Sequence, residues 1–161
     1  MTICMPDTRE ILTILGAIIG DKKLIRPSGE PWDLGKAAVG THVTYLCDAD
    51  DEKLGAVVTD LVATVYLGGK LVMMPDAAMA DKVRARHVDE TMLEALEEVV
   101  NMTRSVFNGV AGNVHLHATP PSPLEKPRPD GGDVWLLEPA ERLDLGGECS
   151  FGALRIAMLF R

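Results

Sequence analysis

The residue pair best suited to chemistry in this sequence is Glu98 and Asn101, which stand three positions apart in segment 89–107. On a helix, a carboxylate and a carboxamide at that spacing project side by side. The carboxylate can bond a cation, and the amide can hold a water molecule with both a donor and an acceptor. Asn is worse than Ala in mid-helix by about 0.6 kcal/mol and gains no cap there. Such a pair can enter another protein's site as a unit.

Segment 89–107 has the pattern of one long amphipathic helix that would position the pair. Asp89 is suited to cap its start, and Gly109 follows its end. At about 100° per residue, one side gathers residues that we expect to pack on a sheet: Met92, Leu93, Leu96, Val99, Val100, Thr103, Val106 and Phe107. The opposite side carries a polar stripe, in which Glu94 and Ser105 are candidate partner-binding residues: Glu94, Glu98, Asn101, Ser105 and Asn108. Every amphipathic helix has a solvated face, so a stripe without function stays an open alternative.

Turn signals and changes of periodicity divide the rest of the chain into short elements. The strands on either side of the acidic turn 48–51 predict a hairpin, and the mostly apolar stretch 151–160 predicts a central strand. Gly68 and Gly69 allow a break in the helix that Asp60 caps. The predicted elements are helix 7–20, loop 26–36, strands 41–46 and 54–59, helix 61–74, a short helix that Asp76 caps and that ends near 86, helix 89–107, strand 114–118, the Pro-rich loop 119–132, and strands 134–137, 141–145 and 151–160.

This order of elements predicts an α+β fold. Runs of strands with helices inserted in blocks favour a mostly antiparallel or mixed sheet of about six strands, with two or three helices packed on one face. The 161 residues fit one domain spanning 1–161. Apolar residues make up 47% of the chain, which is enough for a packed core.

Composition and charge exclude several classes of function. The net charge of −8 argues against nucleic acid as a partner, because phosphate binding needs a basic patch. The longest apolar run near the start, 11–19, is too short to span a bilayer, so we expect no membrane insertion. The three cysteines are odd in number and form no Cys-x-x-Cys, which indicates reduced thiols in a cytoplasmic protein.

Two local patterns partly match phosphate or metal sites but do not fit either. Gly68-Gly69-Lys70 is no phosphate-binding loop, because Leu71 follows where a Ser or Thr would hold magnesium. His115 and His117 would share one face of a strand, but no third ligand stands at a supporting spacing. We therefore expect no metal site from these residues.

The sequence Glu98-Val99-Val100-Asn101, on a long helix followed by a Pro-bearing segment, resembles the CheC/CheX/FliY family of chemotaxis phosphatases. The family's motif is Asp or Ser, three residues, Glu, two residues, Asn, and a later Pro. Glu98 and Asn101 match the Glu and the Asn. Glu94 stands where Asp or Ser is usual, and Pro123 falls one residue short of the Pro position.

The resemblance extends over about residues 39–160, through the hairpin, the apolar helix, the motif helix and the later strands. Helix 61–74 carries no second Glu-x-x-Asn, which is similar to single-site CheX rather than to two-site CheC. A CheX-like domain implies action on a phosphorylated, CheY-like receiver domain. The resemblance assigns Asn101 to position the water that hydrolyses phosphoaspartate and Glu98 to dock the receiver's Lys.

The resemblance also implies that magnesium belongs to the receiver, that no cofactor comes from this chain, and that two copies can pair through a sheet edge. Two alternatives to a phosphatase stay open. In the first, the same fold is a non-catalytic interaction module for a signalling or flagellar-switch partner, which the departure at Glu94 favours. In the second, the chain is a structural or small-ligand domain whose helix has a merely solvated face.

Overall fold

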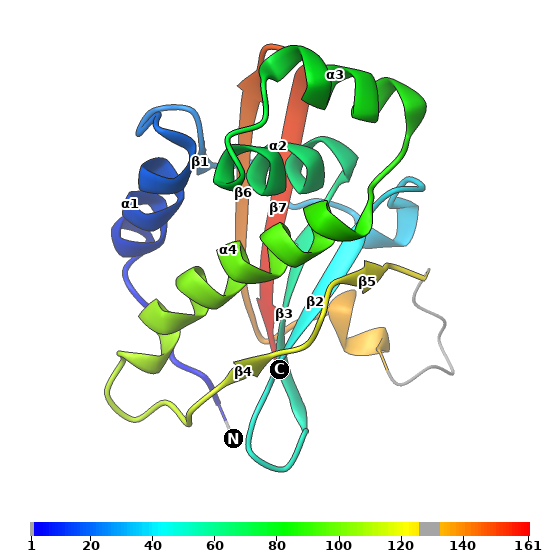
Figure 1. The fold of residues 1–161 in the computed structure, drawn as a ribbon. Helices are drawn as coiled ribbons and strands as arrows, with labels where there is room; N and C mark the ends of the chain where they lie inside the picture. The colour runs from blue at the N-terminus through cyan, green and yellow to red at the C-terminus, as the bar shows by residue number, and fades with distance from the viewer. Residues whose placement is uncertain (1, 126–132) are drawn as a thin grey trace.

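The structure, a computed structural model, describes residues 2–125 and 133–161, and an antiparallel sheet runs through them. The strands follow the order β1-β6-β7-β3-β2-β4, and β5 also pairs with β2 (Figure 1). The α+β prediction is confirmed, and the described residues form seven strands where about six are predicted. Their bounds are β1 Arg26–Pro27, β2 His42–Cys47, β3 Lys53–Thr59, β4 His117–Ala118, β5 Ser122–Pro123, β6 Glu141–Cys149 and β7 Gly152–Phe160.

The helices gather on one face of this sheet, as Figure 1 shows. Helix α2 packs on β7 and β3, α4 crosses α2 and reaches β2 and β4, α1 packs beside α4, and α3 packs on α2. The bounds are α1 Thr8–Ile19, α2 Leu61–Leu71, α3 Asp76–Ala85 and α4 Glu90–Asn108. Within the described residues, no helix has both the length and the apolar character needed to cross a membrane.

Strand β7 is central, as its apolar sequence predicts, because it pairs with β6 on one side and β3 on the other. Successive side chains of a strand point to opposite faces of the sheet. Ile156 and Met158 accordingly join the core under the helices, whereas Ala157 and Leu159 join a second, smaller core on the other face. The sheet is therefore covered on both sides.

Loop segments and short 3-10 turns, rather than helices, cover this second face. Trp32 and Leu34 lie there, with Leu34 in the short helix η1 Leu34–Lys36. The predicted strand 134–137 is wrong, because residues Val134–Leu136 form the 3-10 helix η2. Leu136 is fully buried in the second core and Trp135 packs against that core, whereas Val134 and Leu137 are exposed.

Several predicted boundaries also change. The helix that Asp60 caps ends at Leu71 instead of 74. The short helix ends at Ala85 as expected, but Asp76 is its first residue and Pro75 takes the cap position without a side-chain bond. Strand 114–118 is shorter than predicted, at His117–Ala118, and strand 141–145 extends to Cys149. Loop 26–36 contains β1 and η1, and loop 119–132 contains β5. Residues 126–132 of the latter loop lie outside the described residues.

Helix α2 runs unbroken through Gly68 and Gly69, where the sequence allowed a break. The two glycines have a packing role instead. A Cβ at position 68 would lie 2.7 Å from the carbonyl oxygen of Met92 in α4. At position 69 it would clash with the Sδ of Met79 in α3. The two glycines therefore let the other helices approach α2 closely, and this crossing sets the place of α4.

Candidate functional site

Helix α4 is fixed at both of its ends. The Oδ1 of Asp89 accepts a hydrogen bond from the backbone N–H of Met92 at 3.0 Å, which confirms the predicted cap. The ion pair with Lys82 is the main reason that the pKa of Asp89 lies below its usual value. At the other end, the Asn108 side chain donates to the Leu116 carbonyl at 3.1 Å and accepts from its N–H at 2.9 Å. The helix is therefore a rigid support for whatever its outer face carries.

The inner face of α4 packs as the periodicity predicts. Its buried residues include Met92, Leu96, Val99 and Phe107. The ring of Phe107 stacks on Phe160 of β7 with 4.8 Å between the ring centroids. This packing fixes the rotation of α4 about its axis, and with it the direction of the polar stripe.

The polar stripe faces outward, and Glu98 and Asn101 lie next to each other on it. Glu98 and Glu94 are exposed, and Asn101 is half-buried. Across the described part of the chain, the structure records no hydrogen bond or ion pair of the Glu98 or Asn101 side chain. Ser105 is exposed too, but its hydroxyl donates to the Met102 carbonyl of the same helix. The carboxylate and the carboxamide thus remain open to a ligand, whereas the Ser105 hydroxyl is already engaged.

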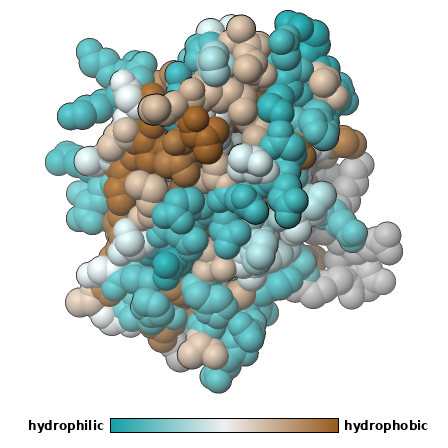
Figure 2. Space-filling model, in the orientation of Figure 1, coloured by the Kyte–Doolittle hydropathy of each residue, from teal (hydrophilic) through white to brown (hydrophobic). Residues whose placement is uncertain are grey.

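Glu98 and Asn101 line a shallow hollow of about 630 Å³ between α4 and α1. Helix α1 contributes Ile14 and Ala17 to it, and α4 also contributes Met102, Arg104 and Ser105. On the same side of the molecule, Figure 2 shows apolar surface next to the hydrophilic surface of α4. The sequence identified the residues of α4 by their spacing, but the part played by α1 depends on tertiary packing that no local pattern encodes.

The later Pro of the motif does not belong to this hollow. Pro123 lies in β5, where it pairs with His42 of β2, and the next residue donates its N–H to the Thr41 carbonyl at 2.8 Å. Of the histidines considered as ligands, His117 pairs with the exposed Asp51 at 3.0 Å. Within the described residues, no three His, Cys, Asp or Glu side chains group in a way that could hold a metal ion.

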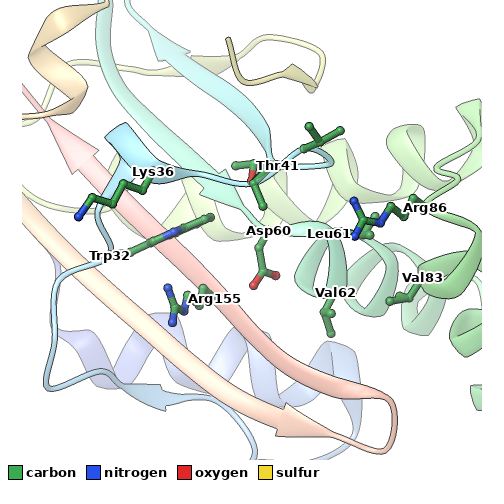
Figure 3. Close-up of a pocket in the computed structure, with 11 residues that line it drawn as sticks. Trp32, Lys36, Thr41, Asp60, Leu61, Val62, Val83, Arg86 and Arg155 are labelled. Atoms are coloured by element: carbon green, nitrogen blue, oxygen red, sulfur yellow. Dashed lines mark hydrogen bonds between the residues drawn. The ribbon is translucent and has the colours of Figure 1, made fainter. Parts of the chain in front are cut away.

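A second hollow, of about 380 Å³, lies at the start of α2 and was not predicted from the sequence (Figure 3). Asp60 and Arg155 point into its space from β3–α2 and β7, and the Trp32 ring lies beside them. Burial raises the pKa of Asp60 above its usual value, and the backbone N–H groups of Ala63 and Arg155 oppose this only in part. The residues come from four separate segments, so local spacing carried no signal for the hollow.

Among comparisons with known proteins, only the comparison with solved structures finds similar proteins. No protein-family model matches the sequence, and no curated protein matches it either. A chain of the CheX-CheY-BeF3-Mg complex from Borrelia burgdorferi is similar with a TM-score of 0.55 and 15% identity, over 98% of this chain and 99% of that one.

Two further solved structures show the same architecture. A CheC-like superfamily protein from Shewanella sp. PV-4 has a TM-score of 0.54 and 13% identity, over 97% of this chain and 95% of that one. Thermotoga maritima FliY has a TM-score of 0.54 and 14% identity, over 93% and 81%. Likeness at such low identity concerns the fold and not the activity. The chain therefore has the fold of the CheC/CheX/FliY proteins, as the sequence resemblance predicts.

Proposed function

We propose that this chain acts on a phosphorylated, CheY-like receiver domain and hydrolyses its phosphoaspartate. The observation that carries the proposal is the outward Glu98–Asn101 pair, free of partners among the described residues, on a helix fixed at both ends. The fold supports it, because one similar structure is a complex of CheX with CheY, BeF3 and Mg. A receiver-domain partner would place the chain in the cytoplasm.

In this reaction the chain only has to position a water molecule and hold the receiver in place. Phosphoryl transfer depends mainly on positioning and on charge stabilisation. The receiver would supply its own magnesium ion and Lys, so this chain needs no cofactor. The Asn101 carboxamide would hold a water molecule in line with the phosphorus. The water oxygen then bonds to phosphorus, the bond from phosphorus to the aspartyl oxygen breaks, and the receiver regains its carboxylate as inorganic phosphate leaves.

Glu98 would hold the receiver in register during this step. Its exposed carboxylate can pair with the receiver's Lys, and a charge-assisted hydrogen bond of that kind is about twice as strong as a neutral one. The neighbouring apolar side chains add contact area, since Met102 of α4 is 38% exposed and Ile14 of α1 lines the same hollow. The rigid mounting of α4 keeps Asn101 within the small tolerance that such a site requires.

The test is the decay of phosphoaspartate on a panel of receiver domains phosphorylated with a small acyl phosphate. We expect the wild-type chain to accelerate decay on at least one receiver, and Asn101→Ala and Glu98→Ala to abolish the acceleration. Glu138→Ala is the matched control, because Glu138 is an exposed carboxylate that does not line the α1–α4 hollow. Decay at the receiver's own rate across the whole panel would remove the catalytic claim.

A non-catalytic docking module is the second candidate, and Glu94 favours it. This carboxylate stands one turn before Glu98, at the position where the resembling family has Asp or Ser. Binding to a BeF3-activated receiver that survives Asn101→Ala, without any acceleration of decay by the wild type, would identify this alternative. Pairing of two copies through a sheet edge is proposed as well, and sedimentation of the purified chain tests it independently of either function.

A further inference from the structure

Arg104 is, among the described residues, the only positively charged side chain that lines the α1–α4 hollow. It stands three positions after Asn101 on α4, just as Glu98 stands three positions before it. Side chains at that spacing are neighbours on the surface of a helix. Asn101 is therefore flanked by a carboxylate on one side and by a guanidinium group on the other.

The guanidinium group of Arg104 is anchored through one of its nitrogens. Its Nη1 donates a hydrogen bond to the backbone carbonyl of Leu116, a fully buried residue. The Asn108 side chain fixes the same stretch of backbone, because it donates to that carbonyl at 3.1 Å and accepts from the Leu116 N–H at 2.9 Å. The position of the guanidinium group beside the hollow is thus set by the free chain itself.

The other two nitrogens of this half-buried side chain have no acceptor among the described residues. Nε is buried without a hydrogen-bond partner, whereas Nη2 has no partner but is not buried. A buried donor without an acceptor costs free energy, and native proteins contain few of them. Nε and Nη2 together form an edge of the fork with which arginine binds carboxylate and phosphate oxygens. An anionic ligand would supply the acceptor that the rest of the chain does not.

The charge of the surroundings explains what a cation would contribute here. The chain has a net charge of −8, and the exposed carboxylates of Glu94 and Glu98 lie on the same stripe as Asn101. Carboxylates repel the negative oxygens of a phosphoryl group, and the carboxamide of Asn101 carries no net charge to offset that repulsion. The guanidinium group of Arg104, one turn further along α4, can offset it.

We propose, on the basis of the receiver function proposed above, that Arg104 binds an oxygen of the phosphoryl group through Nη2. Glu98 and Arg104 then contact opposite charges of the receiver, its Lys and its phosphoryl group, on the two sides of Asn101. Complementary charges of this kind fix the register of a complex. Inorganic phosphate, the product of the reaction, presents the same oxygens and is a ligand of the same chemistry.

The first experiment titrates the full chain with inorganic phosphate at constant ionic strength and follows the Nε–H signals of its arginines by NMR. The signal that disappears in Arg104→Lys belongs to Arg104, because Lys has no guanidinium group. We expect this signal to shift saturably with phosphate and to stay in place with chloride. Arg84 is the internal control, since it is exposed, pairs with Asp81 and does not line the hollow.

The second experiment measures by calorimetry the binding of a receiver domain with and without BeF3, which imitates the phosphoryl group. We expect BeF3 to strengthen binding to the wild-type chain, and Arg104→Gln to lose at least about tenfold of that gain. Affinity for the receiver without BeF3 should not change, a split that a merely structural role of Arg104 would not produce. Arg84→Gln is the matched control, and a circular dichroism spectrum of each variant confirms that it is folded.

Two results would overturn the role of Arg104. These are an Arg104 signal that phosphate does not shift, and an equal gain from BeF3 in the wild type and in Arg104→Gln. Failure of the proposed receiver function gives a different pattern, because it is decided by the wild-type chain alone. The wild type would then accelerate decay on no receiver, whereas phosphate would still shift the Arg104 signal, and the ligand of Arg104 would be free phosphate.

Discussion

Helices α2 and α4 begin in the same way and end up with opposite roles. Each has an Asp cap that accepts a backbone hydrogen bond, at 2.8 Å for Asp60 and 3.0 Å for Asp89. Helix α2 then disappears into the core, with every residue from Ala63 to Gly69 buried, whereas α4 exposes a polar stripe. Only the outer helix can offer side chains to another protein. Its position in the layers, rather than its cap or its length, decides which helix can carry a site.

The largest expected effect separates catalysis, which is proposed for Asn101, from receiver docking, which is proposed for Glu98. Asn101→Ala should slow receiver dephosphorylation by about 100-fold while leaving binding to a BeF3-activated receiver nearly unchanged. Glu98→Ala should instead weaken that binding by at least about tenfold. The free energy of unfolding of Asn101→Ala should not fall, because Ala is the better helix former by about 0.6 kcal/mol. Calorimetric binding and urea unfolding check both parts, and a loss of stability would mean that Asn101 is structural.

The next effect tests the buried helix. Gly68→Ala places a Cβ 2.7 Å from the Met92 carbonyl oxygen, a backbone atom that cannot move without displacing α4. Overpacking of this kind costs about 1–3 kcal/mol, which the better helix propensity of Ala offsets by about 1. We expect a net loss in urea unfolding. Gly69→Ala is the matched comparison and should cost less, because the nearest atom there is the flexible Met79 sulfur. A more stable Gly68→Ala variant would refute the close crossing.

The two caps should respond oppositely to acid. Burial raises the pKa of Asp60 above 3.8, so its contribution to the free energy of unfolding falls as pH rises from 3.8 through the raised value. The Lys82 ion pair lowers the pKa of Asp89, so its contribution is present above 3.8 and is lost as pH falls through the lowered value. Relative to wild type, Asp60→Asn should gain stability as pH rises through its window, and Asp89→Asn should lose it. Urea midpoints at several pH values decide this, and parallel profiles would contradict it.

The smallest expected effect is at Glu94. Like charges at i and i+4 of a helix disfavour each other by about 0.2–0.5 kcal/mol. Glu94→Ser removes the neighbour of Glu98 and should change the dephosphorylation rate by only about twofold. A change much larger than that would show that Glu94 itself contacts the receiver, as a partner-binding residue would.

The difference between α4 and the second hollow also explains what the sequence could predict. Periodicity and the Asp89 cap were enough to place α4, its inner face and the outward pair, because all of these lie within one helix. The central place of β7 followed from its apolar run. The apolar stretch around Leu136 predicts a strand, but Leu136 is buried in the second core, because tertiary packing outweighs the local strand preference. Arg155 and Trp32 line the same hollow from distant segments, for which spacing along the chain carries no information.

Phosphate release is the most direct measure of the role of Asn101. Portions of one phosphorylated receiver preparation are mixed with an equal amount of either the wild-type chain or the Asn101→Ala variant. We expect accelerated release with the wild type and a return to the receiver's own rate with Asn101→Ala, at equal occupancy of the complex. Equal release with both chains would contradict this expectation, because Asn101 would then play no part in positioning the attacking water.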